Sequence, residues 1–259
     1  MNRRLVLGMV AVALLTMGAG CTGFFGGISD EQLDREQNYS DLRDSDADVA
    51  MELSSGNVIN SGEFRAVYDL NGTEELSLHR STIYRDEPLQ IHSVRYWYPN
   101  GTEVTGSELE VSQGRSATTV AVPDENGTLA FSGEAGRKTF RLPAYVDGSY
   151  EVTLPENHRT TNFLFGDVSP NGAEREIVDG QERLYWEEIE ADRTISLRYY
   201  LARDIPVFLG LIGIAVLLGG IGIGYYYRQV KRLQEQREQF GIDVDADDDS
   251  DGGGPPGLL

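Results

Sequence analysis

The sequence predicts a mainly β protein, in which an exported antiparallel β-sandwich domain is followed by one C-terminal transmembrane helix. Two patterns predict this fold class. Short segments with alternating apolar side chains recur between residues 49 and 204, separated by Gly, Pro and Asn turns, as expected of strands with one buried face. Residues 205–227 form an uncharged stretch of 23 residues, which is long enough to cross a bilayer core of about 30 Å.

Residues 1–20 predict a signal peptide. Arg3 and Arg4 precede an apolar stretch over residues 5–15 that is too short to span a bilayer. The arginine pair and the residues after it resemble the twin-arginine export signal. Small residues then lead to Cys21, as in the lipobox of lipoproteins, although Gly18 stands where leucine is usual. We expect lipidation of Cys21; the alternative is cleavage after a small residue, which leaves a free thiol.

Residues 21–48 are glycine-rich and then polar and acidic, with few large apolar side chains. This composition is typical of a flexible tether. Ser29 and Gln32 could cap a short helix that runs through Leu33, but no other feature of the segment predicts packing.

Residues 49–204 carry the strand pattern of the predicted extracellular domain. Seven to nine strands in this length suggest a β-sandwich, for which an immunoglobulin-like topology is one option. The disulfide of immunoglobulin domains is absent, because the chain has one cysteine. The alternating apolar positions are Phe64, Ala66, Tyr68 and Leu70; Val94, Tyr96 and Tyr98; Val120 and Val122; Phe140 and Leu142; Tyr150, Val152 and Leu154; and Ile195, Leu197, Tyr199 and Leu201.

Three Asn-Gly-Thr segments begin at Asn71, Asn100 and Asn126. Asn-Gly favours a type I′ turn, so each predicts a hairpin connection. Each is also an Asn-x-Thr acceptor for N-glycosylation, and Asn38 begins a fourth such sequon. All four lie in the segment predicted to be outside the cell, so we expect glycans at one or more of them.

The basic cluster Arg228, Lys231 and Arg232 follows the predicted membrane span. The positive-inside rule places this end of the span in the cytoplasm and residues 49–204 outside. Glycines at positions that share one side of the helix could let another helix approach closely, which favours self-association or an envelope protein as partner. These residues are Gly210, Gly213, Gly220 and Gly224.

Residues 228–259 form the predicted cytoplasmic tail. A polar stretch up to Phe240 predicts a short helix that continues from the membrane span. Beyond it, residues 243–251 are acidic and residues 252–257 contain only Gly and Pro, which predicts a disordered end.

The chain has 42 acidic and 22 basic residues and a net charge of −20. This charge argues against nucleic acid or an anionic lipid surface as a partner, because both require a basic face. All but two of the basic residues are arginine, the exceptions being Lys138 and Lys231. Such a surface is typical of proteins in concentrated salt, where screening over about 3 Å at 1 M removes the repulsion between carboxylates; the alternative is an ordinary acidic protein.

The sequence points to no catalytic residue, metal site or cofactor. His79, His92 and His158 stand alone, without metal-ligand spacing, and no nucleophile or phosphate-binding motif is present. Trp97 and Trp186 could form an aromatic binding platform, but aromatic residues in strands more often belong to the core.

The arginine pair, the residues before Cys21, the single late span and the acidic Gly/Pro tail together resemble an uncharacterised family of membrane-anchored surface lipoproteins of halophilic archaea. The resemblance covers both ends of the chain and its layout, and it implies no activity for the β-domain. We therefore expect a non-enzymatic surface lipoprotein that contacts membrane lipid and binds or scaffolds a partner. One alternative is an accessory subunit of an export or transport complex, and another is an envelope hydrolase whose carboxylates are brought together by the fold.

Overall fold

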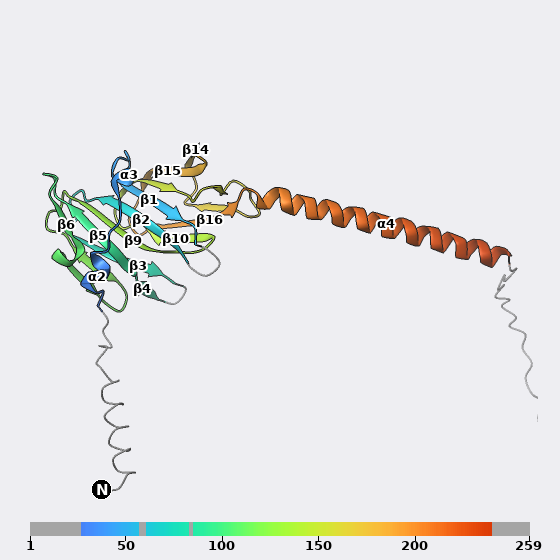
Figure 1. Ribbon diagram of the computed structural model, residues 1–259, viewed down its shortest axis with the longest axis horizontal. Coiled ribbons are helices and arrows are strands. Elements are labelled where there is room, and N and C mark those ends of the chain that lie inside the picture. Colours follow the sequence, from blue (N-terminus) through green and yellow to red (C-terminus); the bar gives the residue numbers. More distant parts are fainter. Residues whose placement is uncertain (1–26, 57–60, 83–84, 240–259) are drawn as a thin grey trace, which may run out of the picture. The chain divides into compact units, whose positions relative to one another are not determined.

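The computed structural model describes residues 27–56, 61–82 and 85–239 (Figure 1). The chain divides into a β-domain that ends at Ala202 and a helical unit that begins at Arg203. The predicted signal peptide, Cys21 and residues 240–259 lie outside the described residues. Each unit is described by itself.

The larger layer of the β-domain is an eight-stranded sheet. All its neighbouring strands are antiparallel except β1 and β11, which are parallel. In order across the sheet, the strands are β14 (Glu174–Val178), β15 (Gln181–Ile189), β11 (Gly148–Thr153), β1 (Val49–Ser54), β2 (Gly62–Asp69), β9 (Thr128–Ala135), β5 (Ile91–Trp97) and β6 (Glu103–Thr105).

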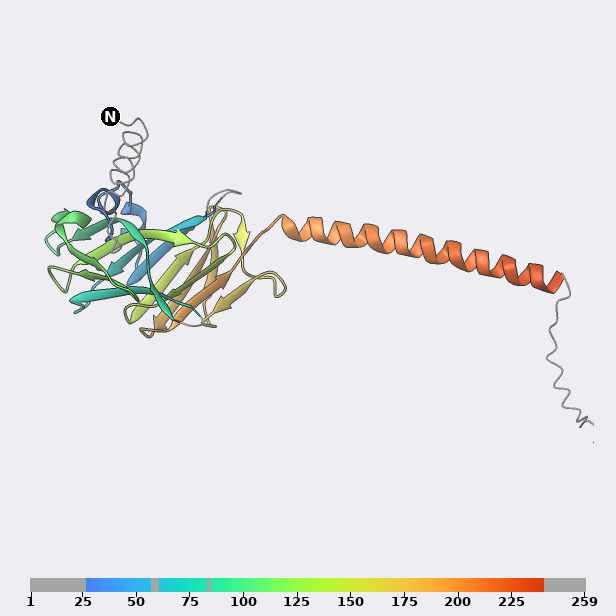
Figure 2. The same cartoon turned by 90° about the horizontal axis from the view of Figure 1, so that it is seen from below.

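Shorter sheets form the second layer (Figure 2). One has the order β4 (Asp86–Pro88), β3 (Glu75–Ser81), β8 (Thr118–Ala121), β7 (Glu110–Gln113), and the other β10 (Thr139–Pro143), β16 (Thr194–Arg198), β13 (Asp167–Ser169). Outside these layers, β12 (His158–Arg159) pairs with β17 (Tyr200–Leu201), and a 3₁₀ turn, η1, spans Gly106–Glu108. The predicted sandwich is confirmed. Its strand order departs from the immunoglobulin arrangement that the sequence left open, because one sheet has eight strands.

The core lies between the two layers. Phe64 and Tyr68 on β2 point into it and are fully buried, as the alternation predicts. Phe64 packs edge-on against Phe140 of β10 across the layers at 5.4 Å between ring centroids, while Tyr68 stacks on Phe131 of β9, also at 5.4 Å. Aromatic contacts therefore join the sheets at the centre of the domain.

Because several tyrosines are buried, the free energy of unfolding should decrease at high pH. Burial raises the pKa of Tyr39, Tyr68, Tyr145 and Tyr150, and raises that of Tyr199 to about 12. An unfolded tyrosine ionises near pH 10. Above that pH the unfolded chain releases protons that the folded chain keeps, so stability is fully present below pH 10 and declines as the pH rises towards 12.

We expect denaturant titrations above pH 10 to show this decline, and Tyr199→Phe to make it shallower between pH 10 and pH 12. The chain has 13 tyrosines and only two lysines, so tyrosine side chains account for most of the titration in this range. A free energy of unfolding that stays constant above pH 10 would contradict the burial of these phenols.

The three Asn-Gly turns differ from one another. Asn100-Gly101 joins β5 to β6 as the predicted hairpin, but only Gly101 has a positive φ, of 84°, so the turn is not type I′. The turns at Asn71 and Asn126 connect strands of different layers, β2 to β3 and β8 to β9. The hairpin prediction is wrong for these two, because Asn-Gly favours a tight turn without specifying which strands pair.

Residues 29–47 form a strap over the large sheet, where the sequence predicts a tether. The predicted helix is present as α2 (Asp30–Leu33), in which Ser29 Oγ accepts a hydrogen bond from the Gln32 N–H, and α3 (Ser40–Arg43) follows. Leu33, Tyr39 and Leu42 are buried. The tether interpretation is wrong for this segment, because three large side chains suffice to fix a polar segment on an existing apolar surface.

The strap covers the outer face of the large sheet. Tyr39 and Leu42 pack with Ala50, Val67 and Ala130, whose neighbours in β1, β2 and β9 face the core between the layers. The central strands are therefore buried on both faces, whereas the alternation predicts one.

The helical unit is α4 (Asp204–Gln239), one continuous helix of 36 residues that contains the predicted span and the first part of the predicted tail. Its most apolar window has a mean hydropathy of 2.4, and none of that window is buried. Among the described residues it is the one helix long and apolar enough to cross a membrane.

Candidate functional site: the strap pocket

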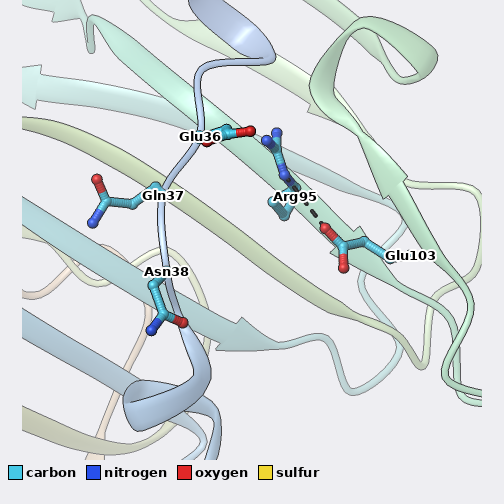
Figure 3. Close-up of a pocket in the computed structure, with 5 residues that line it drawn as sticks. All are labelled: Glu36, Gln37, Asn38, Arg95 and Glu103. Carbon is cyan, nitrogen blue, oxygen red and sulfur yellow. Dashed lines mark ion pairs between the residues drawn. The ribbon is translucent and has the colours of Figure 1, made fainter.

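A shallow pocket lies between the strap and the edge of the large sheet (Figure 3). We call it the strap pocket; Glu36, Gln37 and Asn38 line it from the strap, Arg95 from β5 and Glu103 from β6, and its volume is about 600 Å³. The Glu36 carboxylate points towards Arg95, while Gln37 points away from it. The pocket thus places one guanidinium among polar and acidic groups.

Arg95 holds the strap on the sheet. Its side chain is buried, and Nη2 donates to the carbonyl oxygens of Asp34 at 3.0 Å and Arg35 at 3.3 Å. Nη1 donates to Val94 O at 2.7 Å, and Nε lies 3.4 Å from Glu103 Oε1. Both terminal nitrogens and Nε therefore have partners within the protein, and these contacts join the strap to β5 and β6.

Trp97 lies beneath the strap. Its Nε1–H donates to Glu103 Oε2 at 3.1 Å, Tyr39 packs edge-on against its ring, and the Arg43 guanidinium lies 4.3 Å from its centroid. The second tryptophan, Trp186, is also buried. Neither forms an exposed binding platform; both belong to packed regions.

Hydrogen bonds fix the strap at two points. The Tyr39 hydroxyl donates to Ser93 O at 2.7 Å and lies 2.8 Å from Ser132 Oγ. Asp34 accepts from the Ser107 hydroxyl at 2.7 Å and from the Ser107 N–H at 2.9 Å, and these bonds lower the pKa of the Asp34 carboxyl. The strap is thus a fixed part of the β-domain.

A second pocket, of about 570 Å³, includes His92, Glu63 and Glu134. His92 Nε2 lies 3.1 Å from Glu63 Oε1, and its Nδ1 lies 3.0 Å from Ser93 Oγ. Burial lowers the pKa of His92, while the Glu63 carboxylate acts in the opposite direction. This carboxylate–imidazole–hydroxyl chain resembles part of a hydrolase site, but Ser93 is fully buried and a substrate cannot reach its hydroxyl.

The fold brings two carboxylates of this pocket together, because Glu63 and Glu134 occupy facing positions on β2 and β9. A carboxylic acid that serves as the general acid of a hydrolase usually lies in a buried site, whereas the Glu134 side chain is exposed. The arrangement therefore supplies no evident acid–base pair. Among the described residues, no group of three or more His, Cys, Asp or Glu side chains could hold a metal ion.

The four predicted glycosylation residues Asn38, Asn71, Asn100 and Asn126 are exposed. Asn38 differs from the others because it belongs to the strap: its Oδ1 accepts from the Ser40 N–H at 3.0 Å and the Ser40 hydroxyl at 2.9 Å. The other three are in turns between strands.

The predicted helix-packing residues Gly210, Gly213, Gly220 and Gly224 all lie in α4. A Cβ at each of them would have no atom within 4 Å. Cys21, the predicted lipidation residue, lies outside the described residues.

Sequence reasoning missed Tyr39 and Arg95, the two residues that fix the strap. A tyrosine isolated in a polar acidic segment was the available signal for the first. Nothing local marks Arg95, because its acceptors at Asp34 and Arg35 are about 60 residues away in the chain. The apolar run Phe163-Leu164-Phe165 between strands was a further signal in the sequence that led to no prediction.

Comparison with known proteins identifies one family. The model of a family of unknown function, DUF5803, matches residues 45–245, which include every strand of the β-domain and all of α4. The search of curated proteins finds no match. Since the family model covers most of the sequence, the chain belongs to this family of unknown function.

Proposed function

We propose that this protein is a non-enzymatic cell-surface lipoprotein of a halophile, in which α4 spans the membrane and the β-domain binds or scaffolds a partner at the outer face. The proposal rests on the exposed apolar surface of α4. Its most apolar window is not buried against protein, and large side chains such as Leu217 and Ile223 are about 70% exposed. So large an apolar surface requires a lipid or protein cover.

The sequence around α4 supports an external β-domain. Arg228, Lys231 and Arg232 follow the apolar stretch, and positive charge marks the cytoplasmic side of a span. The export signal and Cys21 at the other end of the chain favour the same direction and supply a second, lipid anchor. The arginine-rich, lysine-poor composition supports a salt-rich environment.

The partner proposed is an envelope protein or a second copy of the chain. In support, the four glycines Gly210, Gly213, Gly220 and Gly224 share one side of α4. Leu217 also projects from this side, but the step from Gly220 to Gly224 has the small-xxx-small spacing that lets another helix approach closely. The same surface would serve an accessory subunit of an export or transport complex. The hydrolase alternative is less well supported, because the Glu63–His92–Ser93 chain ends at a buried hydroxyl.

Removing the anchors singly and together tests the proposal. One variant ends after Ala202, a second carries Cys21→Ser, and a third combines both changes. We expect the full chain and each single variant to remain with the membranes and the double variant to enter the medium, because either anchor holds the domain. Fractionation of cells, membranes and medium with an alkaline wash of the membranes measures this.

The outcomes separate the two anchors. If the truncation alone releases the domain, α4 is an anchor but Cys21 carries no effective lipid. If the double variant stays tightly bound to membranes, or the full chain is already soluble, anchoring by α4 and lipid is wrong.

A further inference from the structure

The loop of residues 160–166, between β12 and β13, exposes large apolar side chains. Phe163 is 84% exposed and Leu164 57%. Among the described residues of the β-domain, Ile177 is the one other exposed large hydrophobic. Two such side chains side by side at a loop tip are unusual in an acidic domain and call for a cover.

The loop is held in a fixed conformation at its base. The buried carboxylate of Glu182 accepts from the Thr160 N–H and from the Thr160 hydroxyl, each at 2.7 Å. Asn162 Oδ1 accepts from the Leu164 N–H at 2.9 Å, and Asn162 O accepts from the Gly166 N–H at 2.7 Å. Phe163 and Leu164 are therefore exposed at the tip of a turn whose conformation is fixed by these hydrogen bonds.

Gly166 and Tyr200 complete the loop. A Cβ on Gly166 would lie 2.0 Å from Thr160 O, so the two ends of the loop approach closely only because position 166 is glycine. Thr161 Oγ1 lies 3.3 Å from the Tyr200 hydroxyl, and the rings of Phe165 and Tyr200 are 6.0 Å apart. Phe165 is half-buried, in contrast to the exposed Phe163 and Leu164.

The pairing of β12 with β17 connects this loop to the residues that directly precede α4. β12 precedes the loop and pairs with β17, with His158 opposite Leu201 and Arg159 opposite Tyr200. Only two residues separate Leu201 from Asp204, where α4 begins, and such a connection reaches at most about 11 Å. A membrane that contains α4 must therefore come close to the β12–β17 pair.

We propose that the 160–166 loop is a membrane contact, with Phe163 and Leu164 inserted at the boundary between lipid headgroups and acyl chains. Aromatic and aliphatic side chains favour this position, and the loop contains no acidic residue. The inference rests on the proposed membrane span. Because the domain is acidic, the contact is apolar and should depend little on salt or on lipid charge.

Tryptophan fluorescence of the full chain in neutral-lipid vesicles tests the proposal. Phe163→Trp reports on the loop, and Val216→Trp reports on α4. Glu125→Trp is the matched control: it is exposed and lies next to the end of β2, at the end of the sandwich opposite to β12. The native Trp97 and Trp186 are buried, so they contribute a constant background.

We expect the emission of Phe163→Trp to be blue-shifted and to be quenched by nitroxides placed near the lipid headgroups. The emission of Glu125→Trp should be quenched by aqueous acrylamide alone. Val216→Trp should be quenched by nitroxides deep in the acyl chains. If Val216→Trp responds and Phe163→Trp does not, the loop contact is wrong and the span stands. If Val216→Trp does not respond, the span itself is wrong. A Phe163→Trp emission that is blue-shifted yet insensitive to lipid quenchers indicates a protein contact and overturns the proposal.

Discussion

Replacing Tyr39 with alanine is expected to lower the free energy of unfolding of the β-domain by about 3–5 kcal/mol, the range for removing a large aromatic side chain from a packed site. Tyr39 is 2% exposed and packs against Trp97 and Ala130 on the outer face of the large sheet. Its hydroxyl donates to Ser93 O at 2.7 Å. The substitution removes both the packing and the hydrogen bond that hold the middle of the strap.

Two further variants separate these contributions. Tyr39→Phe keeps the ring and removes the donor to Ser93 O, at an expected cost of about 1 kcal/mol, rising to 3 kcal/mol if the carbonyl is left without a partner. Gln37→Ala changes a strap residue that lines the pocket and points away from Arg95, and it should change stability by less than about 0.5 kcal/mol.

Denaturant unfolding in high salt measures the three variants, and hydrogen exchange shows whether protection is lost over residues 29–47. An effect of Tyr39→Ala no larger than that of Gln37→Ala would show that the strap contributes nothing to stability.

The arrangement of the strap could be predicted only in part. Alternation in Phe64, Ala66 and Tyr68 identifies the side of β2 that faces the core, because the side-chain period of a strand is two. Val67 breaks this alternation, as do Ala50 and Ala130 in their strands. Such uninterrupted apolar runs are typical of strands buried on both faces, and they were the signal that a further segment covers the sheet.

Which segment covers the sheet was not predictable, because its contacts are remote in the chain. The Tyr39 hydroxyl contacts Ser93, which is 54 positions away in the chain, and Ser132, which is 93 positions away. The residues next to Tyr39 in the sequence are acidic and polar. The Ser29 cap of α2 is local and was predicted correctly. Local geometry was thus accessible from the sequence, whereas the docking of the strap and the Arg95 contacts depend on tertiary packing.

The same limit applies to the turns and to the 160–166 loop. Asn-Gly marks a chain reversal at positions 71, 100 and 126, but the next strand can join either layer, and two of the three change layers. The exposed tip of the loop depends on the buried Glu182, which in the sequence is one acidic residue among many.

The side of the membrane on which the β-domain lies tests the central claim most directly. Glu125→Cys places a thiol at an exposed turn of the β-domain, and Gln234→Cys places one in α4 beyond the basic cluster. Intact cells, kept at their growth salt concentration, are treated with a membrane-impermeant maleimide before and after permeabilisation. The unaltered chain gives the background from Cys21, whose thiol would be blocked by a lipid.

We expect Glu125→Cys to be labelled in intact cells, and Gln234→Cys to be labelled only after permeabilisation. Labelling of Gln234→Cys in intact cells, or protection of Glu125→Cys until the membrane is opened, would contradict an external β-domain anchored by a single span.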